Sequence, residues 1–428
     1  MFAFQRSRRI GLSAVACGLT ILSAAVGIVA MASPALARPD YVAMASLPQP
    51  PVPLRFVMPP HAPHLAPGIR QVCPTPIRAG PVQCEALVNT RASAQARKAQ
   101  APVRVGAITN PGISPATIQS LYGLAAAAAS GGTGVTVAVV DAYDDPKAAP
   151  DLADYRFESG QPACPDPSGV GTGPGCLTQV NQTGGTSLPG TDPTGGWEAE
   201  EALDIEMVSA MCPNCHVLLV EANSPSITDL AIAENTAVAL GAAVVTNSWG
   251  SGSEFIGETN FDSAFNHPGV AITAASGDSG YGTQYPAVSP YVTSVGGTTL
   301  YYVTPPTNAW IQDASSTTGS GCSVLEPKPS WQESAPSPFG GCPNRTGNDV
   351  AAVGDPNLGA MAVMDTYPAT GLNVGWNFMG GTSVATAVIA GVYAIAGQPA
   401  PGTYPASYLY QLPGALHDVS TGPANGTC

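Results

Sequence analysis

The chain alternates between short apolar runs and segments whose apolar positions recur at helical spacing. The runs are rich in β-branched and aliphatic residues without polar alternation, which is typical of buried parallel strands. Two helices are expected within residues 114–129 and 226–241, the first with Ser114 as its cap. We expect strands within residues 134–145, 216–223, 242–250, 269–280 and 291–300.

Strands that alternate with helices predict the α/β class, with a doubly wound, mostly parallel sheet flanked by helices. Polar residues collect where the predicted strands end, at Asp141, Asn247, Ser248 and Asp278. Open α/β sheets bind their ligands beyond the carboxyl ends of their strands. The sequence therefore predicts a site at this edge of the sheet.

The charge balance narrows the class of partner. The chain has 428 residues, with 29 acidic and 15 basic side chains and a net charge of −14. Binding of phosphate needs a basic patch, and none is visible in the sequence, so we expect no nucleic-acid partner. Hydrophobic residues make up 44% of the chain, which is enough to build a core and argues against general disorder.

Residues 1–37 have the organisation of a secretory signal peptide, with a basic start, an apolar run and the small-residue signal "ALA". The apolar run could also span a bilayer, so an uncleaved anchor is the alternative. We expect cleavage after Ala37, an extracellular location and no stable membrane association afterwards. Residues 38–105 are rich in Pro and Ala, and we expect an irregular segment that could serve as a short propeptide. Residues 106–428 form the main predicted domain.

Apart from Cys17 in the signal and Cys428 at the end, the cysteines fall into close pairs. Such pairs in an exported chain are typical of disulfides. The stretch "CPNCH" could instead indicate a redox or zinc site, with His216 beside it, but no second pair lies at ligand spacing. The pairs are Cys73 and Cys84, Cys164 and Cys176, Cys212 and Cys215, and Cys322 and Cys342.

The stretch "GGTSVATAVIAG" (380–391) predicts a tight turn that opens a buried helix. Ser383 would lie at the helix N-terminus, where backbone N–H groups point outward. This suits a nucleophile, and a serine nucleophile needs a base. None of the five histidines begins a helix beside Gly and Thr, as the base of a subtilisin does, so a histidine base is poorly supported.

Carboxylates offer another base. The stretch "GWEAEEALDIEM" (196–207) predicts an acidic helix in which Glu200 and Asp204, four residues apart, share a face. A buried pair of carboxyls has a raised pKa and can exchange a proton with Ser383. Glu201 is three residues from Asp204, so the spacing alone does not choose between the two glutamates. The alternative is that these residues only favour a helix N-terminus.

Asp278 lies in the turn "SGDSG" after an apolar strand. The turn is also a common structural one. If burial keeps Asp278 protonated, its carboxyl can donate a hydrogen bond to a forming oxyanion. This role predicts activity in acid, because ionisation would turn a donor into a repelling charge.

Four segments resemble the sedolisin family of serine-carboxyl peptidases: "EEALD", "SGDSG", "YPAVSPYVTSVGGTTL" and "GGTSVATAVIAG", in this order. The resemblance implies a subtilisin-like fold for residues 106–428 and an endopeptidase that acts at acid pH. It implies a triad of Ser383, Glu200 and Asp204, with Asp278 in the oxyanion hole, and so selects Glu200 over Glu201.

The resemblance also implies an extended hydrogen-bond network at Asp141 and Trp249. It implies a calcium site with Asp418 and the carbonyl oxygen of Val419 as ligands. The further ligands of that site are missing, because the sequence ends at Cys428. Calcium needs several oxygen ligands, so we expect the site and the C-terminus of the domain to be incomplete.

We therefore expect a secreted, monomeric serine-carboxyl endopeptidase that cleaves proteins or peptides in acid through an acyl-enzyme. One alternative is a subtilisin-like protease that acts near neutral pH. The other is a catalytically inactive or impaired secreted homologue, a fragment, with a binding or structural role.

Overall fold

The structure is a computed structural model that describes residues 65–73, 82–99, 112–166, 168–302, 310–314, 317–333, 341–367 and 372–419. The chain divides into two units, residues 1–47 and 48–428, and every described residue belongs to the second. The predicted signal peptide, Cys17 and Cys428 lie outside the described residues. None of the helices in the described ranges combines the length and apolar character needed to cross a bilayer.

The main sheet has eight strands, in the order β11–β10–β9–β7–β4–β6–β5 with β12 beside β10. All neighbours pair in parallel except β11, which is antiparallel to β10. This arrangement confirms the predicted fold class. The strands are β4 (Thr136–Ala142), β5 (Leu177–Asn181), β6 (His216–Ala222), β7 (Val244–Asn247), β9 (Ala271–Ala275), β10 (Thr293–Tyr302), β11 (Trp310–Ala314) and β12 (Val350–Val353).

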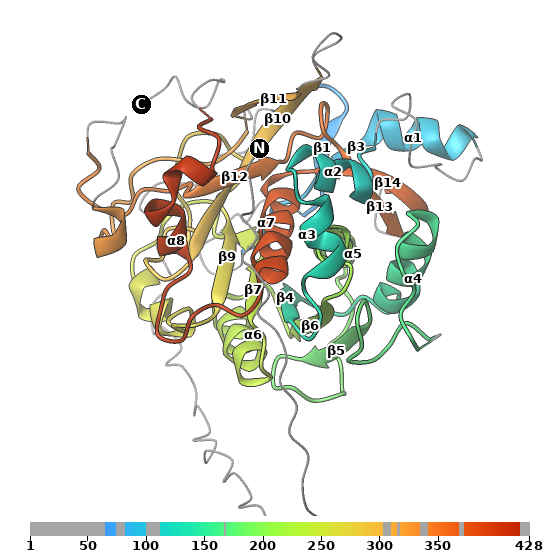
Figure 1. The fold of residues 1–428 in the computed structure, drawn as a ribbon, viewed down its shortest axis with the longest axis horizontal. Helices are drawn as coiled ribbons and strands as arrows, with labels where there is room; N and C mark the ends of the chain where they lie inside the picture. Colours follow the sequence, from blue (N-terminus) through green and yellow to red (C-terminus); the bar gives the residue numbers. More distant parts are fainter. Residues whose placement is uncertain are drawn as a thin grey trace, which may run out of the picture. The chain divides into compact units, whose positions relative to one another are not determined.

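Helices cover both faces of this sheet (Figure 1). On one face, α5 (Gly196–Met211) and α7 (Thr382–Ala396) pack on each other and on the strands. Outside them lie α2 (Pro115–Leu121), α3 (Ala125–Ser130) and α4 (Ala148–Glu158). On the other face, α6 (Ile227–Ala239) packs against β4, β6 and β7.

The helix predicted at residues 114–129 is two helices. The Ser114 hydroxyl caps α2 as predicted, because its Oγ accepts a hydrogen bond from the Thr117 N–H at 3.1 Å. The break follows Tyr122, where Gly123 takes a φ of 68°, which glycine adopts without strain. The predicted single helix was therefore wrong at this turn.

A second sheet is antiparallel and connects the start of the domain to the serine turn. Its order is β1 (Ile69–Gln71), β3 (Leu87–Asn89), β14 (Gly375–Gly380) and β13 (Met361–Asp365). The short β2 (Gln83–Cys84) pairs with β8 (Trp249–Gly250), and α1 (Thr90–Ala99) follows β3. Residues 82–99 are therefore regular structure, and the expectation of an irregular segment does not hold for them. The remaining elements are α8 (Ala406–Gln411), η1 (Glu258–Ala264), η2 (Ser330–Gln332) and η3 (Pro413–Ala415).

All four predicted cysteine pairs form disulfides. Cys212 and Cys215 bond to each other, as predicted, so their sulfurs are not available as zinc ligands. The ring of His216 lies between two hydroxyls, with Nδ1 3.2 Å from Thr136 Oγ1 and Nε2 2.9 Å from Thr178 Oγ1. This histidine has a structural role at the start of β6.

The contact between α5 and α7 is close because Gly391 lacks a side chain. A Cβ placed on Gly391 would lie 2.5 Å from the Cβ of Met211, well inside contact distance. The helices approach each other at this point, and this approach sets the position of the N-terminus of α7.

We predict that Gly391→Ala lowers the free energy of unfolding by about 1–3 kcal/mol, because the extra methyl overpacks the contact. The loss should appear although alanine favours a helix over glycine by about 1 kcal/mol. Urea denaturation measures it. Gly414→Ala is the matched control, since a Cβ there meets nothing within 4 Å. A neutral or stabilising Gly391→Ala would contradict the close approach.

Candidate active site

The N-terminus of α5 is held by Asp192, which fixes the helix that carries the predicted base. Asp192 Oδ2 accepts hydrogen bonds from the N–H groups of Gly196 and Trp197 at 2.9 and 3.2 Å. Glu198 Oε1 in turn accepts from the Asp192 N–H at 2.7 Å. This reciprocal pair resembles a capping box and satisfies the first donors of the helix.

Ser383 lies one residue inside α7, directly after β14. Gly381 makes the turn between them with a φ of 98°, a conformation that favours glycine. The Ser383 hydroxyl donates to the carbonyl oxygen of Ser248 at 3.3 Å. It also lies near enough to the carboxyl of Glu200 to lower the pKa of that group.

Glu200 and Asp204 face the serine turn from α5, and Asp141 joins them from β4. All three side chains are buried, and none of their carboxyl oxygens has a partner at hydrogen-bonding distance and angle. Burial, followed by repulsion from Asp204 and Asp141, raises the pKa of Glu200 well above its usual value. Burial likewise raises the pKa of Asp204, against the opposing effect of the Ser248 hydroxyl. The group is a buried carboxyl cluster next to a serine hydroxyl.

The structure separates the two glutamates that the spacing left open. Glu201 is also fully buried, but its pKa is raised by burial and then chiefly by Glu221 and Asp145, with Asp141 as an acid that it shares with Glu200. Glu200 alone of the pair is influenced by the Ser383 hydroxyl. The geometry therefore brings Glu200, rather than Glu201, to the serine.

Asp278 follows β9 and lies at the N-terminus of α7. Its Oδ1 accepts a hydrogen bond from the Thr382 N–H at 2.9 Å, and its Oδ2 is buried without a partner. Burial and the nearby carboxyl of Glu85 raise the pKa of Asp278 well above its usual value. A protonated Oδ2 would be a free donor beside Ser383.

Trp249 contacts the backbone of the residue that precedes Asp141, and not the Asp141 side chain. Its Nε1–H donates to the carbonyl oxygen of Val140 at 2.9 Å, one residue before Asp141. The indole therefore anchors the end of β4 and lies beside the carboxyl cluster without bonding to the Asp141 carboxyl. The two residues are close, but the link between them is indirect.

The described histidines lie elsewhere. His216 is held in the main sheet, as described above, and His267 places Nε2 3.1 Å from Asn235 Oδ1. His417 is exposed near the last described residues, and His61 and His64 lie outside the described ranges. Within those ranges, no histidine is hydrogen-bonded to Ser383.

Glu85 is a buried acid of this site that sequence reasoning missed. It lies between β2 and β3, where its carbonyl oxygen accepts a hydrogen bond from the Ser383 N–H and its side chain accepts one from the Asp278 N–H. Burial raises its pKa to about 7, although three hydrogen bonds oppose that shift. The only sequence signal was an acidic residue inside an apolar stretch, which is too common to mark a site.

The calcium prediction finds no support in the donors present. Asp418 and Val419 are the last described residues, and Asp418 is exposed. No group of three or more His, Cys, Asp or Glu side chains in the described part of the chain could hold a metal. Two residues supply fewer oxygen ligands than a calcium ion takes.

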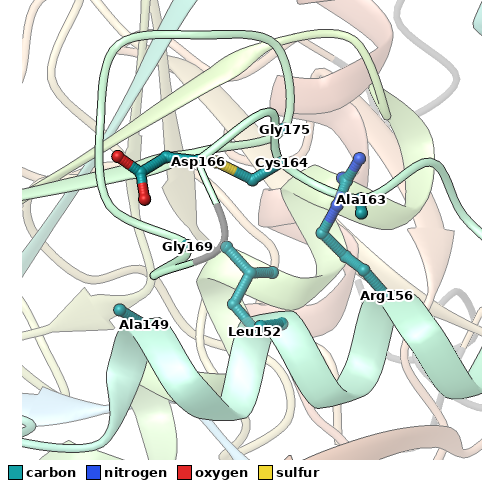
Figure 2. A pocket seen from close by; sticks show the side chains of 9 residues that line it. Ala149, Leu152, Arg156, Ala163, Cys164, Asp166, Gly169 and Gly175 are labelled. Carbon is teal, nitrogen blue, oxygen red and sulfur yellow. The ribbon is translucent and has the colours of Figure 1, made fainter.

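A pocket of about 70 Å³ lies between α4 and the loop closed by the Cys164–Cys176 disulfide (Figure 2). At its edge the Arg156 guanidinium donates to the carbonyl oxygens of Pro162 and Pro213. Its lining includes none of the predicted site residues. The predicted catalytic residues lie elsewhere, around the N-terminus of α7.

Comparisons with known proteins agree with this geometry. A model described as the subtilase family matches residues 184–412, which is more than half of the chain. The chain belongs to the subtilase family. The matched region includes α5, the Asp278 turn and the Ser383 turn. The prediction of a subtilisin-like member is confirmed.

Individual relatives point to the sedolisin type. Kumamolisin from Bacillus sp. (strain MN-32) is 30% identical over 278 residues, covering 58% of this chain and 48% of the relative. Human tripeptidyl-peptidase 1 is 33% identical over 185 residues, covering 36% and 30%. The chain thus spans half or less of the length of these curated relatives.

The fold comparison is consistent with both. The solved structure of Pseudomonas sedolisin, a serine-carboxyl proteinase complexed with two molecules of pseudo-iodotyrostatin, superposes with a TM-score of 0.55. It covers 73% of this chain and 89% of that chain at 22% identity, so the likeness concerns the fold. The resemblance to sedolisins drawn from the four motifs is confirmed.

We predict that Glu200→Gln stabilises the protein at neutral pH. The raised pKa of Glu200 means that its stabilising, protonated form is fully present below the unfolded-state value and is lost as pH rises. Glutamine does not titrate, so the melting temperature of the variant should exceed that of the wild type at pH 7, with the gap closing toward pH 4. The exposed Glu333→Gln is the matched control. A gap independent of pH would contradict the argument.

Proposed function

We propose that this chain is a secreted serine-carboxyl endopeptidase that hydrolyses peptide bonds of proteins in acid through an acyl-enzyme. The observation that carries the proposal is the convergence of Ser383 and the Glu200 carboxyl between α5 and α7, with Asp278 at the same helix end. The sedolisin-type relatives support the same chemistry. Four disulfides and the predicted signal at residues 1–37 support secretion.

We assign residues 106–428 to the peptidase domain, and the strands within residues 82–89 extend it. Ser383 is the nucleophile, Glu200 is the general base and then the general acid, and Asp204 orients Glu200 and shares its charge. Asp141, on β4, is the third acid of this buried carboxyl cluster. The pairing of these acids keeps one proton available inside the cluster.

In the first step the Ser383 hydroxyl transfers its proton to Glu200 as Oγ attacks the carbonyl carbon of the peptide bond. The developing oxyanion is stabilised by the Ser383 N–H and by the protonated Oδ2 of Asp278. Glu200 then gives the proton to the leaving amine, the C–N bond breaks, and the acyl-enzyme remains. Water repeats the sequence and releases the acid.

Activity in acid follows from the opposite protonation states that the mechanism requires of Glu200 and Asp278. Glu200 must be ionised to accept a proton, whereas Asp278 must be protonated to donate one. Rising pH therefore improves the base and removes the donor, which gives a bell-shaped profile. The described histidines are held elsewhere, which favours this proposal over a histidine-based neutral protease.

We predict that the full chain hydrolyses casein between pH 3 and 5 and that Ser383→Ala lowers the rate by about 10³-fold or more. Glu200→Gln should be comparably impaired, because it cannot take the proton. Glu333→Gln, exposed and distant from this chemistry, should match the wild type.

Three results would count against the proposal. Full activity in Glu200→Gln would show that another group is the base. A rate maximum above about pH 7 would count against the proposal, because Asp278 must stay protonated to donate a hydrogen bond to the oxyanion. An inert wild type would favour the alternative of a non-catalytic homologue.

A further inference from the structure

Residues 83–86 run through the candidate active site as an extended strand. β2 pairs antiparallel with β8, with Gln83 opposite Gly250 and Cys84 opposite Trp249. The next residue, Glu85, donates its N–H to the carbonyl oxygen of Ser248 at 2.9 Å. The chain therefore adds a strand to the segment that borders the serine, which is how extended peptides bind to a sheet edge.

The carbonyl group of Glu85 lies against the catalytic groups. Its oxygen accepts a hydrogen bond from the Ser383 N–H at 3.2 Å, the donor that the mechanism assigns to the oxyanion. A Cβ placed on Gly381 would lie 2.1 Å from this oxygen and 2.7 Å from Oδ2 of Asp278, so both flank the same glycine. The Glu85 carbonyl thus occupies the position of a carbonyl under attack.

The strand continues past the serine as a substrate would. After Ala86, β3 pairs antiparallel with β14, with Leu87 opposite Gly380 and Val88 opposite Met379. A bound peptide needs one edge before the cleaved bond and another after it. β8 supplies the first edge and β14 the second, with the peptide bond between Glu85 and Ala86 at the serine.

The side chain of Glu85 enters a pocket lined by hydrogen-bond donors. Its Oε1 accepts from Gln284 Nε2 at 3.0 Å, and its Oε2 accepts from the Asp278 N–H at 3.2 Å. Gln83, in the strand itself, adds a third donor at 3.1 Å. The Glu85 carboxyl in turn raises the pKa of Asp278 and that of Glu200.

The orientation of Gln284 is fixed by the backbone. Its Oε1 accepts from the Gly252 N–H at 2.9 Å, and its Nε2 donates to the carbonyl oxygen of Ala275 at 3.1 Å. Its amide lies against Gly250, where a Cβ would fall 2.1 Å from Nε2. The amide therefore presents N–H, and not C=O, to the pocket.

We propose that residues 83–86 occupy the substrate cleft as a tethered substrate analogue, and that the enzyme prefers glutamate on the acyl side of the cleaved bond, with Gln284 reading that side chain. The proposal rests on the proposed peptidase function and names its substrate class. Gln284 acts here as a specificity residue that touches the substrate side chain.

The donor set explains why glutamate is preferred over its isostere. A glutamine could satisfy Gln284 with its carbonyl, but its NH₂ group would then face the Asp278 N–H, whereas the second oxygen of a carboxyl can accept that hydrogen bond whether the group is ionised or protonated. A leucine would leave both donors unpaired, and a lysine would bring only further donors. Leaving buried donors unpaired costs enough to lower kcat/KM by about tenfold or more.

The tether also closes the site. Ser383 and Glu200 are fully buried with the strand in place, and the Cys73–Cys84 disulfide holds the strand one residue before Glu85. A substrate must displace the segment before it can reach the serine. Glu85→Leu removes the side-chain hydrogen bonds that hold the segment in place, so it should speed the cleavage of added peptides.

The test uses internally quenched peptides that differ only in the acyl-side residue: Glu, Gln, Leu or Lys. We expect the full chain at pH 4 to cleave the Glu peptide after glutamate, with kcat/KM about tenfold or more above the others. The Gln284→Met variant should lose the preference for the Glu peptide. It should cleave the Leu peptide with the same kcat/KM that the wild type shows for the Leu peptide. Gln398→Met is the matched control, because Gln398 is exposed beyond the far end of α7 and should keep the preference.

Equal cleavage of the four peptides by the wild type, or an unchanged preference in Gln284→Met, would overturn the inference while leaving the proposed function intact. Faster cleavage by Glu85→Leu supports the tether, and slower cleavage with an unchanged melting temperature overturns it. If Glu85→Leu fails to fold, Glu85→Gln replaces it, since it keeps the shape and loses one acceptor.

If no peptide is cleaved, a binding measurement distinguishes failure of this inference from failure of the proposed function. The double variant Ser383→Ala, Glu85→Leu is titrated with fluorescent, uncut Glu and Leu peptides. Binding about tenfold tighter for the Glu peptide would support the inference even if the proposed catalysis fails. Equal binding would overturn it.

Discussion

The packing of α5 against α7 is the contact on which the site depends. One helix brings acids into the interior, and the other begins at the serine, so their close approach at Gly391 and Met211 fixes how near the proposed base lies to the proposed nucleophile. Every residue of α5 is buried, its glutamates and aspartate included. Water is excluded there, and the acids remain protonated more readily than they would at the surface.

This burial is the physical basis of the acid activity that we propose. A buried carboxyl costs little free energy while it is neutral and much more once it is ionised. Acids away from the serine show the same effect: burial raises the pKa of Glu234 to about 8 and that of Glu221 to about 9. Stability is therefore expected to weaken as pH rises, and the proposed Asp278 donor is lost in the same direction.

Much of the secondary structure follows from local sequence. The strands within residues 134–145, 216–223 and 269–280 form where apolar runs predicted them, because such runs are stable only inside a sheet. Ser114 and Ser226 cap their helices through interactions that reach only three residues along the chain. The four cysteine pairs were also local. The helix at residues 114–129 failed at Gly123, where one backbone angle ends the helix.

What the sequence by itself determined was the set of candidates: a serine at a helix start, an acidic helix, and an aspartate turn, each defined by neighbours a few residues away. Only the tertiary structure decided which of them meet. It brought Glu200, and not Glu201, to Ser383, since the choice depends on how α5 is rotated against α7. It also placed Glu85 in the site through strand pairings with residues 249–250 and 379–380. Such pairings join segments far apart in the chain, and no local pattern encodes them.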